Sequence, residues 1–272
     1  MSEQLYTKLN NGVKMPLLGL GVYDTYGAEA EAAVMKAIET GYRLIDTAAM
    51  YGNETEVGNA IRQDGIKRKE LFVTTKVDNG DQGYDATMSG FDVSMKKLNI
   101  EYIDLYLVHW PIRNKREGTW KALEKLYHDK RVRSIGVANY LIPFLEELKD
   151  YATEVPVVNQ VEFTPWLYLK ELLLYCKEKN IQLQSYSPIT RGKKFGDTRL
   201  LELCRKYDKS PAQIILRWNI EHGVSVIPKT VNPDRLKENF SVFDFSLSAD
   251  DVAFMDSFNE NFRICDNPMV ML

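Results

Sequence analysis

The feature that most constrains the fold of this chain is an alternation of short apolar runs with segments of helical periodicity, repeated eight times. Apolar runs separated by amphipathic helices are typical of the buried parallel strands of an α/β protein. Eight such units predict a closed (β/α)₈ TIM barrel. An open doubly wound sheet is the alternative, but no GxGxxG turn follows the first expected strand. The expected strands cover residues 17–20, 43–46, 71–77, 103–109, 133–138, 157–162, 181–186 and 224–228, and the expected helices cover 28–40, 53–63, 85–98, 118–128, 142–151, 169–179, 198–207 with 211–222, and 233–240.

Two segments extend the eight units. Residues 6–16, TKL-NNG-VKMP, predict an N-terminal β-hairpin with Asn11-Gly12 in its turn. The segment SLSADDVAFMDSFNENF predicts an extra C-terminal helix, capped by Ser248 or a neighbouring residue. Because the sequence contains no linker, repeat or low-complexity stretch, we expect one barrel domain over residues 1–272.

Composition narrows the classes of function. The net charge of -3 gives no basic footprint for a nucleic acid, and no apolar run reaches the length of a membrane span. Residues 1–11 contain no apolar h-region, so we expect no signal peptide. Cys176, Cys204 and Cys265 are odd in number and widely spaced, which argues against a disulfide framework or a zinc site. We therefore expect a cytoplasmic protein with no bound metal.

Polar residues gather at the ends of three consecutive expected strands. Asp46 ends the second strand, Tyr51 lies in the loop that follows, Lys76 lies in the third strand and His109 ends the fourth. A parallel barrel brings these strand ends around one mouth. Each residue alone has an ordinary structural explanation, such as a turn former, a packing aromatic, a rim lysine or a buried histidine. Their joint occurrence favours a catalytic group.

A second polar cluster follows the eighth expected strand, in VIPKTVNPDRLKEN. Asn232 is a good N-cap and Pro233 suits the first helical position. A helix N-terminus presents free N–H groups to an anion, and Lys229, Thr230 and Arg235 add two cations and a hydroxyl. The cluster predicts a phosphate site at the place where barrels usually have one. The alternative is a capped surface helix with solvated charges.

Over nearly its whole length, the chain resembles the aldo-keto reductase family, and its short loops resemble the bacterial or protozoan 2,5-diketo-gluconate reductase-like branch. The resemblance implies that Asp46, Tyr51, Lys76 and His109 form a catalytic tetrad. It also implies NADPH-dependent reduction of aldehydes and ketones to alcohols. The matching segments are LLGLGVY, GYRLIDTAAMYGNE, LFVTTKV, YIDLYLVHWP, SIGVANY, NQVEF, SYSP, VIPKT and NPDRLKEN.

The same resemblance implies how NADPH or NADP+ is held. Two cations favour a cofactor with a 2′-phosphate over one with a bare hydroxyl. The family usually has a Ser-Asn pair where this chain has Ala138-Asn139, which removes one hydroxyl. The implied contacts are Lys229, Thr230 and Arg235 to the 2′-phosphate, Glu238 and Asn239 to the adenine, Tyr186 stacked on the nicotinamide, Asn139 and Gln160 to its carboxamide, and Ser187 and Ile189 to the pyrophosphate.

The chemistry of carbonyl reduction agrees with these roles. No side chain supplies a hydride, so a cofactor must do so. The reaction leaves negative charge on oxygen, which needs a proton or hydrogen bonds. Tyr51 is the expected proton donor, and Lys76 is expected to lower its pKa. Asp46 would keep Lys76 charged, and His109 would orient the carbonyl through a hydrogen bond.

The sequence is less informative about the substrate than about the cofactor. Tyr23, Met50 and Trp110 follow expected strands and should line the pocket. The loop PIRNKREG and the tail RICDNPMVML are both short, which predicts an open site for small activated carbonyls, α-dicarbonyls or keto-sugars. The basic residues at 113, 115 and 116 would attract anionic substrates, or simply belong to a solvated loop.

Two other functions fit parts of the pattern. A non-catalytic NADP-binding or structural protein could keep this fold, but the intact tetrad argues against it. A barrel enzyme that uses Lys76 as a Schiff-base lysine is the other alternative, and Tyr51 with the VIPKT cluster favours the reductase. We expect a monomer whose partner is a small-molecule carbonyl substrate, with no nucleic acid and no membrane.

Overall fold

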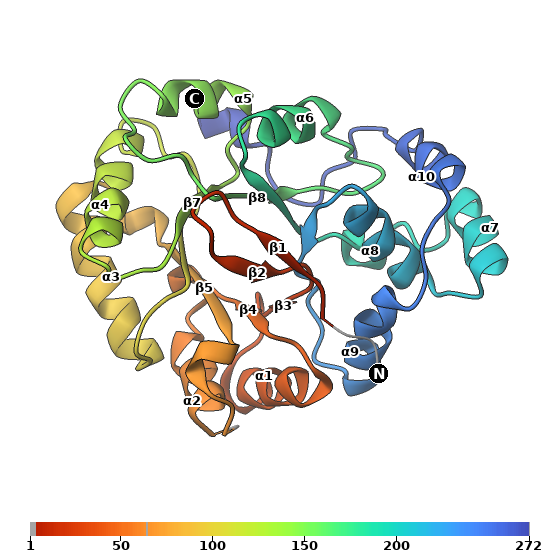
Figure 1. Cartoon of the computed structure of the whole chain (residues 1–272), viewed down its shortest axis with the longest axis horizontal. Helices are drawn as coiled ribbons and strands as arrows, with labels where there is room; N and C mark the ends of the chain where they lie inside the picture. The colour runs from red at the N-terminus through yellow and green to blue at the C-terminus, as the bar shows by residue number, and fades with distance from the viewer. Residues whose placement is uncertain (1–3, 64, 272) are drawn as a thin grey trace.

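The computed structural model describes residues 4–63 and 65–271. Its centre is a sheet of eight parallel strands in sequential order, from β3 to β10, with helices between successive strands (Figure 1). The strands are β3 (Leu20–Gly21), β4 (Leu44–Asp46), β5 (Phe72–Val77), β6 (Leu105–Val108), β7 (Ile135–Ala138), β8 (Val158–Glu162), β9 (Gln182–Tyr186) and β10 (Ser225–Val226).

The first and last strands of the sheet meet, which closes the barrel. Parallel bridges join Leu18 to Val226 and Gly21 to Lys229. The backbone N–H of Gly19 donates to the carbonyl oxygen of Val226 at 2.9 Å. Gly21 permits this close approach, because a Cβ atom there would lie 2.8 Å from the carbonyl oxygen of Ile227. The prediction of a (β/α)₈ barrel is confirmed.

Helices surround the barrel and bury their apolar faces against it (Figure 1). All the expected helices are present, although the one expected at 118–128 begins two residues earlier and the one at 142–151 ends earlier. The helices are α1 (Gly27–Thr40), α2 (Glu54–Gln63), α3 (Tyr84–Leu98), α4 (Arg116–His128), α5 (Ile142–Leu148), α6 (Lys170–Glu178), α7 (Thr198–Tyr207), α8 (Pro211–Glu221), α9 (Pro233–Phe240) and the extra helix α10 (Ala249–Asp256), capped as expected by Ser248.

The predicted hairpin covers one end of the barrel. Its strands β1 (Tyr6–Lys8) and β2 (Lys14–Pro16) pair antiparallel and lie across the ring of strands in Figure 1. Leu9 and Met15 belong to one buried cluster with Leu44, which begins β4, and with the first residues of β5 and β6. The hairpin therefore fills the N-terminal end of the barrel, and the opposite end carries the open cleft.

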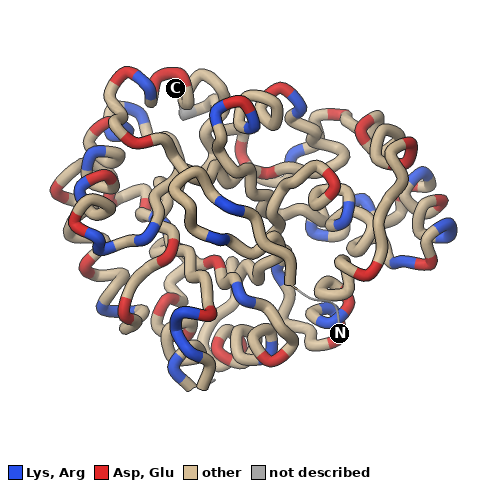
Figure 2. The backbone as a smooth tube through the Cα atoms, viewed as in Figure 1, with Lys and Arg blue, Asp and Glu red and all other residues tan. Residues whose placement is uncertain are grey.

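The outer surface carries both signs of charge. Lys and Arg residues are interspersed with Asp and Glu residues along the outer helices in the view of Figure 2. Among the described residues, no helix has both the length and the apolar character needed to cross a membrane.

Candidate active site

A cleft of about 980 Å³ opens at the C-terminal ends of the barrel strands. The structure brings nearly all the predicted site residues to it, although they are spread over more than two hundred positions of sequence. Only Lys76 is absent from the lining, because it lies beneath the floor with no exposed surface. The predicted residues that line the cleft are Tyr23, Asp46, Met50, Tyr51, His109, Trp110, Asn139, Gln160, Tyr186, Ser187, Ile189, Lys229, Thr230, Arg235, Glu238 and Asn239.

Neighbouring strands place the four tetrad residues. Asp46 is the last residue of β4, Lys76 lies near the end of β5, and His109 follows β6 directly. Tyr51 ends a short 3₁₀ turn, η1 (Ala49–Tyr51), and Gly52 leaves that turn with a φ of 68°. Because parallel strands end at one rim, these side chains converge on one point.

A buried ion pair underlies the cleft, with Asp46 at its floor and Lys76 beneath. The Lys76 ammonium lies 2.6 Å from a carboxylate oxygen of Asp46 and donates also to the carbonyl oxygen of Thr47 at 2.9 Å. Its third contact is the phenol oxygen of Tyr51 at 3.4 Å. Burial opposes the charged form of Lys76, but Asp46 and Tyr51 outweigh that effect and raise the pKa of Lys76. The lysine is therefore held as a cation with all three N–H groups engaged.

This geometry argues against the Schiff-base alternative. A Schiff-base lysine must be neutral and reachable by the substrate carbonyl. Lys76 has no exposed surface. Burial lowers its pKa, but Asp46 raises it by more, so the pKa lies above the ordinary lysine value. Its contacts suit an electrostatic role instead.

Opposing effects set the pKa of Tyr51. Burial raises it, Lys76 lowers it in part, and the net direction is upward. Lys76 lowers this pKa as expected, but it does not bring it below the ordinary tyrosine value, because loss of water around the phenol outweighs the attraction of one cation. Tyr51 is protonated at neutral pH and is available as a proton donor.

His109 is a neutral hydrogen-bonding group at this site. Burial lowers its pKa well below the ordinary value, and the charge of Lys76 adds to that effect. Its ring packs edge-on against Tyr51, with centroids 5.6 Å apart. The Nδ1 atom is buried without a hydrogen-bond partner among the described residues. At neutral pH the ring is therefore uncharged and can take part in hydrogen bonds.

Amide side chains continue the network away from the tetrad. Gln160 donates from Nε2 to the second oxygen of Asp46 at 2.7 Å and to Gln184 at 2.8 Å. Asn139, with a φ of 64°, donates to the carbonyl oxygen of His109 at 2.9 Å. The phenol of Tyr186 donates to Asn139 at 2.8 Å. The residues predicted to hold the nicotinamide thus form one hydrogen-bonded wall beside the ion pair.

The predicted phosphate site lies where β10 leads into α9. Asn232 caps the helix as expected, but its side chain accepts from the N–H groups of Asp234 and Arg235. Those two N–H groups are not free for an anion, which corrects part of the prediction. The Thr230 hydroxyl oxygen accepts from the backbone N–H of Asn232 at 3.2 Å, so its hydrogen can point outward.

Two exposed cations complete this end of the cleft. Within residues 4–63 and 65–271, Lys229 and Arg235 take part in no ion pair that would neutralise them. The Glu238 carboxylate accepts a hydrogen bond from Ser210, and Asn239 is buried next to it. Two cations and one hydroxyl at the end of a long cleft fit the phosphorylated end of a dinucleotide.

Sequence reasoning missed part of the cleft wall. The short tail was expected to leave the site open, but Ile264, Cys265 and Asp266 line the cleft. Arg191 lines it too, in a left-handed conformation with a φ of 50°, and its guanidinium lies 5.6 Å from the ring centroid of Tyr23. None of the basic residues at 113, 115 and 116 belongs to the lining. The tail has no periodicity that could have revealed its path.

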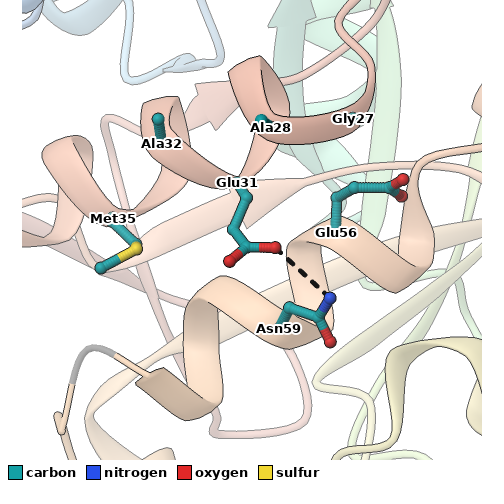
Figure 3. A pocket seen from close by; sticks show the side chains of 7 residues that line it. All are labelled: Gly27, Ala28, Glu31, Ala32, Met35, Glu56 and Asn59. Atoms are coloured by element: carbon teal, nitrogen blue, oxygen red, sulfur yellow. Dashed lines mark hydrogen bonds between the residues drawn. The ribbon is translucent and has the colours of Figure 1, made fainter.

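A smaller hollow of about 370 Å³ lies between α1 and α2 (Figure 3). Glu31 accepts a hydrogen bond from Asn59 across it at 3.3 Å. It is formed by the outer helices alone and includes none of the strand-end residues, so the cleft is the candidate site.

Known proteins match this chain over nearly its full length. The family described as "Aldo/keto reductase family" matches residues 18–260. A glyoxal reductase from Bacillus subtilis is 48% identical, over 97% of this chain and 96% of its own length. A 9,11-endoperoxide prostaglandin H2 reductase from Trypanosoma cruzi is also 48% identical, over 96% of this chain and 93% of its own length.

Solved structures extend the match to the fold and the cofactor. An aldo-keto reductase from Bombyx mori, crystallised in complex with NADP, aligns with a TM-score of 0.91 at 34% identity, over 98% of this chain and 96% of its own. The chain belongs to the aldo/keto reductase family, and it is an oxidoreductase that uses NADPH or NADP+ as its cofactor.

Proposed function

We propose that this protein reduces small activated aldehydes and ketones to alcohols, with Tyr51 as the proton donor. One contact carries the proposal: the buried Lys76 ammonium lies 3.4 Å from the phenol oxygen of Tyr51, which lines the cleft. An ammonium only donates, so the Tyr51 oxygen must accept this bond. The phenol hydrogen is then free to be donated to a substrate oxygen in the cleft.

The proposed mechanism assigns separate tasks to the residues. NADPH supplies the hydride when it is bound. Neutral His109 donates a hydrogen bond that orients the substrate carbonyl. Tyr51 gives its proton to the developing alkoxide, which is a stronger base than a phenolate. The phenolate that remains is stabilised by Lys76, and Asp46 keeps that lysine charged. In the reverse direction Tyr51 acts as the general base.

The first prediction tests the proton donor. Tyr51→Phe keeps the ring packed against Tyr23 and His109 but removes the hydroxyl. General acid catalysis contributes about 10²–10⁴-fold, so kcat for a small dicarbonyl should fall at least about 100-fold while NADPH still binds. The measurement is NADPH consumption together with a fluorescence titration of cofactor binding.

Two outcomes of this experiment would contradict the proposal. A Tyr51→Phe variant with near wild-type kcat would remove Tyr51 from the mechanism. A wild-type protein that binds NADPH but reduces none of a panel of aldehydes, ketones and keto-sugars would favour the non-catalytic alternative.

We also propose that the cluster after β10 selects NADPH over NADH. Lys229, Thr230 and Arg235 would hold the 2′-phosphate, and Glu238 and Asn239 would contact the adenine. At the other end, Tyr186 would stack on the nicotinamide, and Gln160 would offer its carbonyl oxygen to the carboxamide, since its nitrogen already donates to Asp46 and Gln184. Asn139 would also contact the carboxamide, and Ser187 and Ile189 the pyrophosphate.

Arg235→Ala tests this cofactor assignment. A charge-assisted hydrogen bond contributes about 1.5–3 kcal/mol, so the Kd for NADPH should rise at least about tenfold while that for NADH stays nearly unchanged. Lys237→Ala is the matched control, because Lys237 is an exposed cation on the same helix that does not line the cleft. Equal losses for NADPH and NADH in Arg235→Ala would show that this arginine does not contact the 2′-phosphate.

The proposed substrates are small activated carbonyls, including α-dicarbonyls and keto-sugars. Tyr23, Met50 and Trp110 would form the substrate rim, and the first two are about half exposed. A relative of 48% identity is named a glyoxal reductase. The same identity to a prostaglandin H2 reductase means that similarity alone does not select the substrate.

Substrate preference gives a direct test. Because short loops offer few apolar contacts, and each buried CH₂ contributes about 0.8 kcal/mol, a steroid ketone should gain little from its extra surface. We expect kcat/KM for methylglyoxal to exceed that for a steroid ketone by at least about tenfold. A steroid preferred by the same margin would contradict the proposal that the site suits small carbonyls.

We further propose that the enzyme works as a monomer in the cytosol. The chain itself carries the four tetrad residues and the cations after β10, which supports a monomer as the working unit. The three cysteines are unpaired in the structure, which suits a reducing compartment.

A further inference from the structure

The C-terminal tail lines the cleft, and the side chain of Glu162 binds its backbone there. Glu162 is the last residue of β8, and its side chain is buried. One of its carboxylate oxygens accepts the backbone N–H of Ile264 at 2.6 Å, and the other accepts that of Cys265 at 3.0 Å. The carboxylate thus accepts hydrogen bonds from two consecutive backbone N–H groups of residues 263–267, a segment without helix or strand.

The proposed mechanism makes no use of this carboxylate. The nearby charges are those of Arg191 and Arg263, and no hydrogen bond to either is present among the described residues. A buried carboxylate without sufficient partners is costly, so the tail N–H groups are what makes Glu162 acceptable at this position. Glu162 and the tail therefore stabilise each other.

Residues other than Glu162 anchor the tail before residue 264. The N–H groups of Glu260 and Phe262 donate to the carbonyl oxygen of Trp166, at 3.2 and 2.9 Å. Lys194 lies 4.4 Å from the ring centroid of Phe262. These contacts hold the start of the tail, and Met269 packs against the core further along. Between these two anchors, the hydrogen bonds of Glu162 and a side-chain contact of Cys265 with Tyr186 hold residues 264 and 265 at the cleft.

The position of this contact links it to the active site. Glu162 pairs in register with Tyr186 on β9, and it lies two residues after Gln160, which contacts Asp46. Ile264 and Cys265 line the same cleft as Tyr51 and His109. A movement of the tail would therefore change the shape of the cleft beside the proposed nicotinamide wall without touching the ion pair.

We propose that Glu162 is a specificity-determining positioning residue: its carboxylate fixes the C-terminal tail as a wall of the substrate cleft. The wall excludes bulky carbonyls and supplies contacts to small ones. The statement about substrates rests on the proposed function, whereas the statement about the tail does not.

Cys265 reports the position of the tail directly. Its thiol is partly buried, and the chain offers an internal reference in Cys204, which is also partly buried but lies on α7. Release of the tail should raise the alkylation rate of Cys265 and leave that of Cys204 unchanged. Peptide mass spectrometry after timed exposure to iodoacetamide separates the two cysteines in one sample.

Two variants separate tail release from a simple charge effect. Glu162→Gln removes the charge, which by itself would favour the reactive thiolate of Cys265 because the Glu162 charge helps to raise the pKa of that thiol. Glu162→Asp keeps the charge but is one methylene shorter and cannot grip both N–H groups. Asp251→Asn is the control, because Asp251 is a buried carboxylate that ties α10 to Lys206 of α7 and does not line the cleft.

We expect alkylation of Cys265 to rise about tenfold in both Glu162 variants and to stay unchanged in Asp251→Asn, since loss of a charge-assisted hydrogen bond corresponds to at least that factor. A rise confined to Glu162→Gln would assign the effect to charge and overturn the proposal. Unchanged alkylation in both variants would overturn it as well, and this result does not depend on any enzymatic activity.

Kinetics then test the role in specificity. With NADPH affinity unchanged, KM for methylglyoxal should rise about fivefold or more in both variants while kcat changes less than about twofold, and kcat/KM for a bulky ketone should not fall.

Ile264→Ala should have a smaller effect on this selectivity in a Glu162→Gln background than in the wild type, because the side chain is then no longer held at the cleft. Equal effects in the two backgrounds, or an unchanged ratio of the two substrates, would contradict the proposed wall.

Discussion

The ion pair between Asp46 and Lys76 is the interaction on which the rest of the site depends. An ammonium buried without exposed surface costs several kcal/mol unless its charge and its N–H groups are satisfied. Here the carboxylate of Asp46, the carbonyl of Thr47 and the phenol of Tyr51 supply the three acceptors. Removing one partner of such a pair typically costs about 3–5 kcal/mol, so β4 and β5 are held in the arrangement that the chemistry requires.

The same pair organises residues that are distant in sequence. The second carboxylate oxygen of Asp46 accepts from Gln160 on β8, which in turn donates to Gln184 on β9. Four strands of the barrel are thereby joined through one buried carboxylate. Tyr51 and neutral His109 stand above it at the cleft, so a fixed positive charge lies below the proposed proton donor and a hydrogen-bonding group lies beside it.

Much of this arrangement could be predicted from the sequence, because it follows from strand order. Apolar runs alternating with helices predict a barrel, and a barrel places Asp46, Lys76 and His109 on adjacent strand ends whatever the details of the loops. Contacts made by irregular segments could not be predicted in this way. Nothing in the sequence pattern shows that the side chain of Asn53, expected only at the start of a helix, holds the carbonyls of Val22 and Thr25.

Two other features have the same origin. The tail after Phe262 has neither periodicity nor a cap, so its path over the cleft and its contact with Glu162 emerge only in three dimensions. The direction of the Tyr51 pKa depends on how completely the phenol is buried, and burial cannot be read from neighbours in sequence. Local sequence patterns reveal the strands and helices and therefore their order along the chain. Exclusion of solvent depends instead on how the whole site packs.

The central claim is that Lys76 controls the proton on Tyr51. Its most direct test is the pH dependence of kcat for alcohol oxidation, in which Tyr51 must be deprotonated to act as a base. The paired replacement Asp46→Asn with Lys76→Met removes the cation without leaving a buried unpaired carboxylate. Because Lys76 lowers the pKa of Tyr51 more than Asp46 raises it, the rise of kcat with pH should move to higher pH in the double variant. A profile with the same midpoint as the wild type, merely reduced in height, would contradict the account.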